Sequence, residues 1–412
     1  MKQNLREKYH GGGRSTTKRQ RLRKHFFTCG VVMAKAHQAE PSNPTTSWGK
    51  FDHTVMVLQG GGALGAYQAG VHAGLAEAGV SPDWIAGVSI GAINAALIAG
   101  NPPEQRVARL RQFWERVSAH APFVPPLSLD PVRPLFNFMS AASSVAFGVP
   151  GFFSPRLPAP FASPQGNFDA LSLYDTGPLK ASLEELVDFD LINRKAVRLS
   201  LGAVNVSTGN SVYFDNNKTQ IGPEHVMASG ALPPGFPAVH IDGQWYWDGG
   251  IACNSPLWYV LDEDYRMSAL ILQVDVFSGA GELPKSIREV QERMKDIQYS
   301  SKTRVNTDRV SEIEELRNSL HRLLDKLPPE LRTDPDVQKL DAISTRGAVA
   351  LVHFINRHNT RSSSFKDYEF SRATVMELWD FGYSDARRAI SNPQWRHATD
   401  LGNGVRIYDL TK

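Results

Sequence analysis

Short apolar runs alternate with helix-length segments through the first half of the chain. The runs 84–88 and 197–206 are nearly continuous in apolar character, as strands buried on both faces of a parallel sheet are. Around them, 66–79, 90–99 and 102–118 have the length and the apolar spacing of helices. This alternation predicts an α/β fold with a mostly parallel central sheet and helices on both of its faces.

A hairpin pattern follows. The runs 239–241 and 244–247 are separated by Asp242-Gly243, which is a strong signal for a tight turn between antiparallel strands. A further apolar run at 270–276 predicts one more buried strand.

The last third of the chain has a different pattern. Residues 285–327 are highly charged, with leucine and isoleucine at helical intervals, and predict long surface helices, whereas 349–355 predicts a strand. From Phe370 to Ile390, apolar residues recur every three or four positions, so this helix should bury one stripe against the core. We therefore expect a mainly helical C-terminal extension over 285–412.

Residues 121–168 interrupt the regular pattern with many prolines and phenylalanines. Asp130, Arg133 and Arg156 are its only charged residues, which argues against a solvated linker. The prolines predict that no long helix forms, so the insertion either caps a site or contacts lipid. We expect Phe152 and Phe153 to be its mobile, lipid-contacting part.

Composition places the chain among globular proteins. It has 412 residues, of which 42% are hydrophobic, and no apolar run reaches the roughly 18 residues of a membrane span. Cys29 and Cys253 form no disulfide framework and have no metal-ligand spacing, so a reducing, cytoplasmic location is expected, with no metal and no cofactor.

The basic residues are concentrated at the N-terminus. Residues 1–25 carry nine Lys or Arg and one Glu, whereas the whole chain has a net charge of only +3, so the remainder is acidic. We expect 1–50 to be a disordered basic tail. Its short apolar segment 26–33 partly mimics a signal peptide, and Met33 is an alternative start. The tail could contact anionic lipid, but nucleic acid is not expected as a partner.

Two turns carry the candidate chemistry. In Gly87-Val-Ser-Ile-Gly91, a serine follows an apolar run and is flanked by glycines, a spacing that places a nucleophile on a sharp strand-to-helix turn. Ser89 is therefore a candidate nucleophile. The glycines Gly60, Gly61 and Gly62 end another apolar run, and consecutive backbone N–H groups there could bind a developing oxyanion.

A candidate base lies far downstream. Asp248 directly precedes Gly249 and Gly250 at the end of the aromatic run Trp245–Trp247, so its carboxylate could lie at the mouth of a sheet. The dipeptide Asp-Gly alone more often marks a simple turn. The case for Asp248 as a base therefore depends on its occurrence together with the other two motifs.

Together, Gly60-Gly-Gly-Ala-Leu-Gly65, Gly87-Val-Ser-Ile-Gly91 and Asp248-Gly-Gly250 resemble the patatin-like phospholipase family, over roughly residues 53–278. The resemblance implies a three-layer fold and a carboxylic ester hydrolase acting on lipids as a phospholipase A or general lipid acyl hydrolase. It implies a dyad of Ser89 and Asp248, and an oxyanion hole of Gly60, Gly61 and Gly62. The supporting glycines are Gly65, Gly87, Gly91, Gly249 and Gly250.

One departure is Leu64, where the family usually has Lys or Arg, which puts a preference for anionic head groups in doubt. The C-terminal third resembles an extension found in some bacterial members. The expected partners are a lipid or other acyl-ester substrate and, peripherally, a membrane. Oligomeric state has no signal in the sequence.

Three alternatives remain at this stage. An α/β-hydrolase with a Ser-His-Asp triad could draw its base from His321, His353, His358 or His397, although only one clear strand precedes that of Ser89. The glycine run also matches a dinucleotide-binding loop, but Ser89 stands where an acid is needed to bind ribose. The third alternative is a lipid-binding protein without catalysis.

Overall fold

The computed structural model describes residues 51–118, 133–162, 171–263, 268–300, 303–344, 347–358, 366–392 and 405–410. The predictions for the tail 1–50, including Met33, lie outside these residues. No helix in the described ranges is long and apolar enough to cross a membrane.

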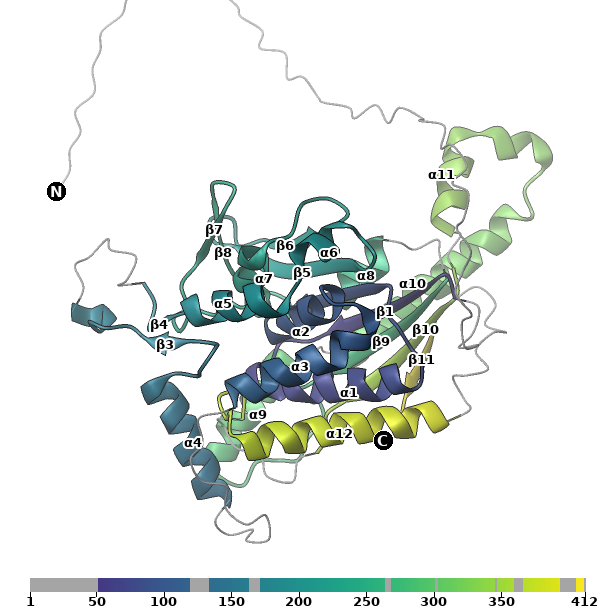
Figure 1. Cartoon of the computed structure of the whole chain (residues 1–412). Coiled ribbons are helices and arrows are strands. Elements are labelled where there is room, and N and C mark those ends of the chain that lie inside the picture. Colours follow the sequence, from purple (N-terminus) through teal and green to yellow (C-terminus); the bar gives the residue numbers. More distant parts are fainter. Residues whose placement is uncertain are drawn as a thin grey trace, which may run out of the picture. The chain divides into compact units, whose positions relative to one another are not determined.

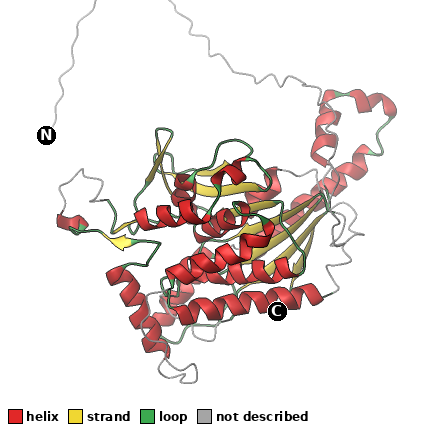
Figure 2. Cartoon of the chain, in the orientation of Figure 1, coloured by secondary structure: helices red, strands yellow, loops and turns green. Residues whose placement is uncertain are grey.

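The described residues form a mixed, nine-stranded central sheet (Figures 1 and 2). Its order is β11-β10-β9-β1-β2-β5-β8-β7, with β6 paired to β5; neighbours from β11 to β5 are parallel, and pairings among β5, β6, β7 and β8 are antiparallel. The strands are β1 (His53–Leu58), β2 (Trp84–Val88), β5 (Arg198–Asn205), β6 (Ser211–Asp215), β7 (Val239–Ile241), β8 (Gln244–Asp248), β9 (Ala269–Asp275), β10 (Val349–Ile355) and β11 (Val405–Asp409).

Helices cover both faces of this sheet, as predicted. Alternate residues of β1 point to opposite faces: Met56 and Leu58 join a core that includes α1, α2, α3 and α12, whereas Val55 and Val57 join a second core with α8. The helices are α1 (Gly65–Glu77), α2 (Ile90–Ala99), α3 (Pro103–Val117), α4 (Arg133–Phe147), α5 (Gly177–Leu186), α6 (Phe189–Asn193), α7 (Pro223–Ser229), α8 (Leu257–Glu263), α9 (Ile287–Tyr299), α10 (Thr303–Leu324), α11 (Pro335–Ser344) and α12 (Arg372–Ser391). The expected three-layer α/β fold is confirmed.

The C-terminal region completes the sheet as well as adding helices. Its strands β10 and β11 extend the sheet beyond β9, and α12 lies along α1 (Figure 1). A Cβ atom at Gly70 would lie 2.0 Å from the Trp379 carbonyl oxygen, and one at Gly382 would lie 2.0 Å from that of Tyr67. Glycine at both positions therefore lets the two helix backbones touch.

The insertion differs from its prediction. A helix of 15 residues, α4, occupies Arg133–Phe147, so the expectation that prolines exclude a long helix was wrong. Pro134 lies in the first turn, where a missing N–H costs nothing, and no proline follows until Pro150. Beyond α4 the described segment contains the short strand β3 (Ser154–Pro155), which pairs with β4 (Tyr174–Asp175), and one turn of 3-10 helix, η2 (Pro160–Ala162).

A buried histidine in α1 lacks polar partners. The ring of His72 is 1% exposed and neither nitrogen has a hydrogen-bond partner. Burial lowers the pKa of His72 from 6.5 to about 3, so the ring stays neutral at physiological pH.

We expect His72→Leu to raise the free energy of unfolding by about 1–3 kcal/mol, because an apolar side chain of similar size removes an unsatisfied buried polar group. Chemical denaturation at pH 7 measures this. The unfolded state binds a proton at His72 below pH 6.5 and the folded state does not until about pH 3, so the native chain should lose stability as the pH falls through that window. The variant should lack this component, and a less stable variant at pH 7 would contradict the prediction.

Candidate active site

The two glycine-rich turns lie together because their strands are parallel neighbours. Leu58 of β1 pairs with Gly87 of β2, so the turns that follow both strands emerge at the same edge of the sheet. Gly60, Gly61, Gly62 and Ser89 line one cavity there.

Ser89 occupies a strained turn between β2 and α2. Its φ of 57° and ψ of −124° lie in a region that non-glycine residues rarely adopt. A Cβ at Gly87 would lie 2.4 Å from the Gly91 carbonyl oxygen, and a Cβ at Gly91 would lie 2.4 Å from that of Leu58. The flanking glycines are thus needed for the turn to form.

A serine on α7 supports this turn. The Ser89 N–H donates to the Ser229 hydroxyl at 3.0 Å, and that hydroxyl donates to the Gly202 carbonyl at 2.6 Å. The segment just after α7 also holds the candidate base, because the Asp248 N–H donates to the Ala231 carbonyl at 3.0 Å.

Asp248 reaches Ser89 across β5. Asp248 ends β8 opposite Ala203, and the preceding residue Gly202 pairs with Val88, which directly precedes Ser89. The carboxylate is 2% exposed and accepts hydrogen bonds from the Ser89 hydroxyl and, at 2.7 Å, from the Gly250 N–H. Burial raises the pKa of Asp248 to about 6, and the two hydrogen bonds oppose that rise.

The three candidate oxyanion glycines differ in their hydrogen bonds. The Gly60 N–H donates to the Asn254 carbonyl at 3.1 Å, which removes it as a free donor. Within the described residues, the N–H groups of Gly61 and Gly62 have no acceptor. Gly62 has a φ of 56°, and a Cβ there would lie 2.2 Å from the Asp367 carbonyl oxygen, so only glycine fits.

The supporting glycines lie at close contacts around the pair. A Cβ at Gly65 would lie 2.5 Å from the Ile90 side chain, and one at Gly249 would lie 2.6 Å from the Gly202 carbonyl oxygen. Gly250 supplies the N–H that binds the Asp248 carboxylate.

The cavity has a volume of about 100 Å³ and a largely aromatic wall. Phe152 and Phe153 line it together with Phe236 and Phe370, and the two are only 7% and 6% exposed. Their rings contact each other and Phe236, with centroids 5.2–5.8 Å apart. The prediction that Phe152 and Phe153 are the part of the insertion that contacts lipid was therefore wrong, whereas the expectation that the insertion caps a site fits their place in the cavity wall.

The C-terminal region supplies a wall that the sequence did not predict. Lys295 and Tyr299 of α9 line the cavity, as do Asp367 and Tyr368. The Lys295 ammonium bonds both Asp367 carboxylate oxygens, at 2.7 and 2.9 Å. Burial raises the pKa of Asp367, and Lys295 opposes the rise. A cation thus lies in the cavity although Leu64 leaves the glycine loop without one.

No described histidine lines this cavity. His358 bonds Asp385 at 3.1 Å, His353 is buried in β10, and His321 lies 3.4 Å from Ser344. His397 lies outside the described residues. The described part of the chain also contains no group of three or more His, Cys, Asp or Glu arranged to hold a metal ion.

Two models of known protein families match parts of the chain. Residues 56–261, half of the chain, match a family model described as patatin-like phospholipase. The chain belongs to this patatin-like family. A second model, described as patatin phospholipase, matches residues 297–401, so the C-terminal region of this patatin-like chain is also a recognised unit.

Among solved structures, the chain is similar to the crystal structure of VipD from Legionella pneumophila, with 14% sequence identity and a TM-score of 0.30. The alignment covers 80% of this patatin-like chain and 67% of the VipD chain. No curated protein matches the chain significantly. Membership of the patatin-like family supports lipid acyl hydrolase activity in general.

Proposed function

We propose that the protein is a serine hydrolase that cleaves fatty-acyl ester bonds of lipids through a dyad of Ser89 and Asp248. The observation that carries the proposal is the buried Asp248 carboxylate, which accepts a hydrogen bond from the Ser89 hydroxyl in a cavity beside the glycine loop. No described histidine competes for this role.

In this mechanism Ser89 Oγ attacks the ester carbonyl carbon while the Asp248 carboxylate takes its proton. The carbonyl oxygen becomes an oxyanion that the N–H groups of Gly61 and Gly62 stabilise. Asp248 then gives the proton to the leaving alcohol, and an acyl-enzyme remains. Water, deprotonated by Asp248, attacks the acyl-enzyme, and Ser89 recovers its proton as the fatty acid leaves.

The environment of each group suits its role. A carboxylate with an ordinary pKa of 3.8 is a weak base, and burial raises the pKa of Asp248 to about 6, nearer to the working pH. Loss of one oxyanion donor typically costs about 2.7–4 kcal/mol of transition-state stabilisation, so the glycine loop matters as much as the base. The aromatic wall suits an acyl chain and excludes water.

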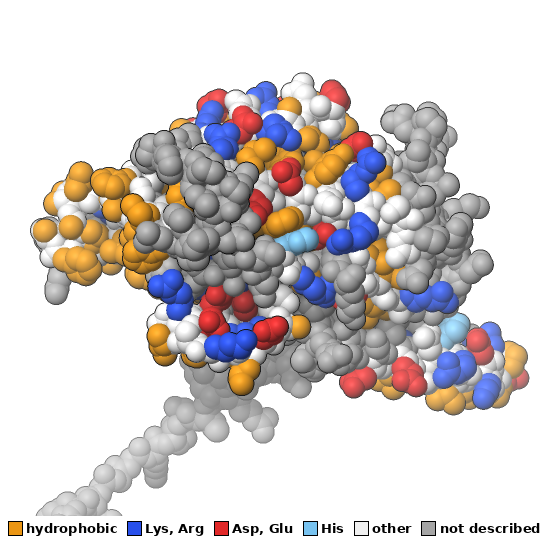
Figure 3. Space-filling view, turned by 90° about the horizontal axis from the view of Figure 1, so that it is seen from below, with side chains coloured by type: hydrophobic (Ala, Val, Ile, Leu, Met, Phe, Trp, Pro, Cys, Tyr) orange, Lys and Arg blue, Asp and Glu red, His pale blue; other side chains and the backbone are white. Residues whose placement is uncertain are grey.

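We further propose that the insertion contacts a lipid surface. Between residues 136 and 162, Arg156 is the one charged residue. Hydrophobic side chains gather at the left of Figure 3, the side on which β3, β4 and η2 lie in Figure 1. The exposed ones from this region are Phe138, Met139, Val145, Phe147, Leu157, Phe161, Leu171 and Leu173. Apolar patches of this kind mark contact surfaces, and an aggregated lipid substrate fits the proposed chemistry.

We expect Ser89→Ala and Asp248→Asn each to reduce ester hydrolysis at least 1000-fold without loss of fold, because the first removes the nucleophile and the second its base. Release of a chromogenic alcohol from a fatty-acyl ester measures activity, and a fluorophosphonate should label native protein but not Ser89→Ala. Ser391→Ala, exposed at the end of α12, is the control. Labelling of Ser89→Ala would place the nucleophile elsewhere, and a histidine variant as inactive as Asp248→Asn would favour a triad.

The pH dependence follows from Asp248. Only the carboxylate form accepts a proton, so kcat/KM on a neutral ester should be level above pH 7 and fall about tenfold per pH unit below an apparent pKa of about 6. A stopped assay from pH 4 to 9, with stability checked at each pH, gives the profile. An acid limb near pH 4 would show that the base is not desolvated in the working enzyme.

Two double variants, each replacing a pair of phenylalanines, distinguish lipid contact from core packing. Phe147 and Phe161 are 71% and 92% exposed, so their joint replacement by serine should reduce activity on long-chain vesicles at least fivefold, with little change on a monomeric short-chain ester or in Tm. The same change at buried Phe152 and Phe153 should lower Tm and reduce activity on both substrates. If both double variants behave alike on vesicles and on monomers, the insertion does not contact lipid.

A further inference from the structure

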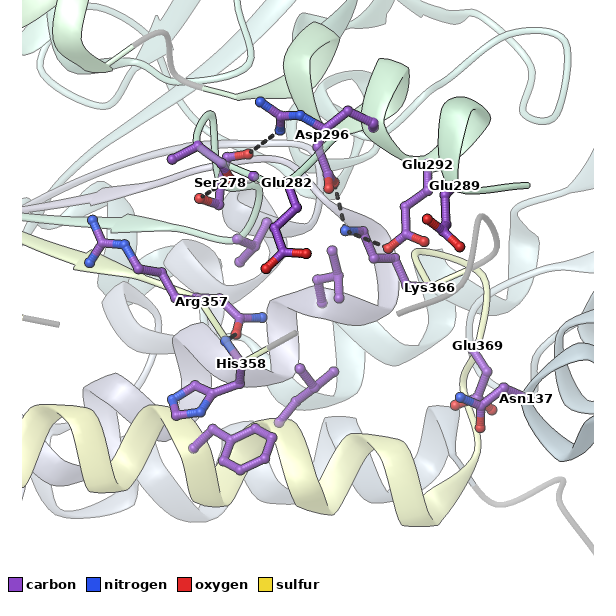
Figure 4. A pocket seen from close by; sticks show the side chains of 18 of the residues that line it. Asn137, Ser278, Glu282, Glu289, Glu292, Asp296, Arg357, His358, Lys366 and Glu369 are labelled. Carbon is purple, nitrogen blue, oxygen red and sulfur yellow. Dashed lines mark hydrogen bonds and ion pairs between the residues drawn. The ribbon is translucent and has the colours of Figure 1, made fainter. Parts of the chain in front are cut away.

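A second, larger cavity lies behind the wall of the proposed active site. It has a volume of about 700 Å³ and lies among α9, the first half of α12, and the loops that follow β9 and β10 (Figure 4). No described residue lines both cavities. The segment 366–370 separates them: Asp367, Tyr368 and Phe370 line the first cavity, whereas Lys366 and Glu369 line the second.

Glu369 is a buried carboxyl group with one oxygen that lacks a hydrogen-bond partner. Its side chain is 1% exposed, and one carboxylate oxygen accepts from the Ser371 N–H at 2.9 Å. The other oxygen is buried without a hydrogen-bond partner, and Glu369 forms no ion pair with the described residues. A buried charge is costly unless a counter-ion meets it, so this end of the cavity favours a cation. In Figure 4, Glu369 lies with Asn137 at the end opposite Arg357 and His358.

The enclosed basic side chains of the cavity already have partners. Lys366 lies 2.6 Å from Asp296 and 3.5 Å from Glu292 (Figure 4). Arg357 forms a bidentate pair with Asp409, at 2.7 and 2.8 Å, and Arg293 donates to two backbone carbonyls. These cations therefore leave Glu369 without compensation.

A further carboxylate and an apolar strip complete the site. Glu282 has no ion-pair partner among the described residues and points toward the middle of the cavity in Figure 4. Leu378 and Phe381, on one face of α12, give the wall an apolar part that suits methylene groups.

We propose that this cavity is a second binding site, for a primary alkylammonium group, with Glu369 as its buried counter-ion and Glu282 as a second anionic contact. An ammonium group donates three hydrogen bonds and matches a carboxylate oxygen that lacks a donor. The cavity is large enough for an aliphatic polyamine, and the same ammonium chemistry occurs in the ethanolamine head group of a lipid.

The test titrates spermidine into the full-length Ser89→Ala protein by calorimetry at low salt, so that the result does not depend on the proposed hydrolase activity. We expect saturable 1:1 binding and a rise in Tm with spermidine. Glu369→Gln keeps the acceptor for Ser371 and removes the charge, and should raise Kd at least tenfold; Glu282→Gln should raise it about threefold. Glu184→Gln, which makes the same charge change at an exposed position of α5, should leave Kd unchanged.

A second arm identifies the source of the ammonium group. Sedimentation with phosphatidylethanolamine vesicles, compared with phosphatidylcholine vesicles, tests the lipid head group. Binding of phosphatidylethanolamine without spermidine, if lost in Glu369→Gln, would support the site and assign it to lipid. The proposal would be overturned if neither probe bound. It would also be overturned if the protein with the unchanged cavity and both cavity variants bound a probe with equal affinity. If Glu369→Gln fails to fold, Glu282→Gln carries the test.

Discussion

The site depends on the hydrogen bonds that hold the turn after β1. The Gln59 side chain accepts two backbone N–H bonds from the end of β9, at 2.7 and 3.0 Å, and donates to the Tyr299 carbonyl at the end of α9. Asn254 and Gly60 exchange a pair of hydrogen bonds, and the Asn254 amide also donates to Tyr299. The Asp367 carbonyl accepts from the first turn after the glycines. Since buried polar groups are costly without partners, these hydrogen bonds stabilise the observed conformation of the loop, and this conformation sets the positions of the glycine N–H groups.

The C-terminal region is thus part of the site and not an attachment to it. Tyr299 and Asp367 fix the glycine loop, and Lys295 and Tyr368 form one wall of the cavity. The region is joined to the rest of the fold through β10 beside β9 and through the glycine contacts between α1 and α12. Truncation before α9 would therefore expose the core and release the loop at the same time.

Local patterns predicted most of the regular structure. The helix expected over 90–99 and the hairpin around Asp242-Gly243 occur with almost the same bounds, because apolar periodicity and glycine act over a few residues. The insertion was harder to predict, since prolines at its ends do not restrict the stretch between them. The burial of Phe152 and the pairing of Lys295 with Asp367 depend on contacts between distant segments, which no local pattern encodes. One local signal for the contacts of the glycine loop was present in the sequence, because Gln59 is a polar residue directly after an apolar strand. In the structure Gln59 is fully buried.

Burial of Asp248 gives the proposed base its strength and also weakens the fold. The difference between a pKa of about 6 in the folded chain and 3.8 in the unfolded one corresponds to about 3 kcal/mol of stability that is absent once the carboxyl is ionised, above pH 6. This cost already includes the opposing effect of the hydrogen bonds from Ser89 and Gly250, which lower the pKa but do not cancel the effect of burial. More donors would stabilise the carboxylate and make it a weaker base. A working base at this position therefore has to be under-solvated, and the strained turn at Ser89 adds to the cost. The dense hydrogen bonding around Gln59 and Asn254 is the kind of local stabilisation that such a site requires.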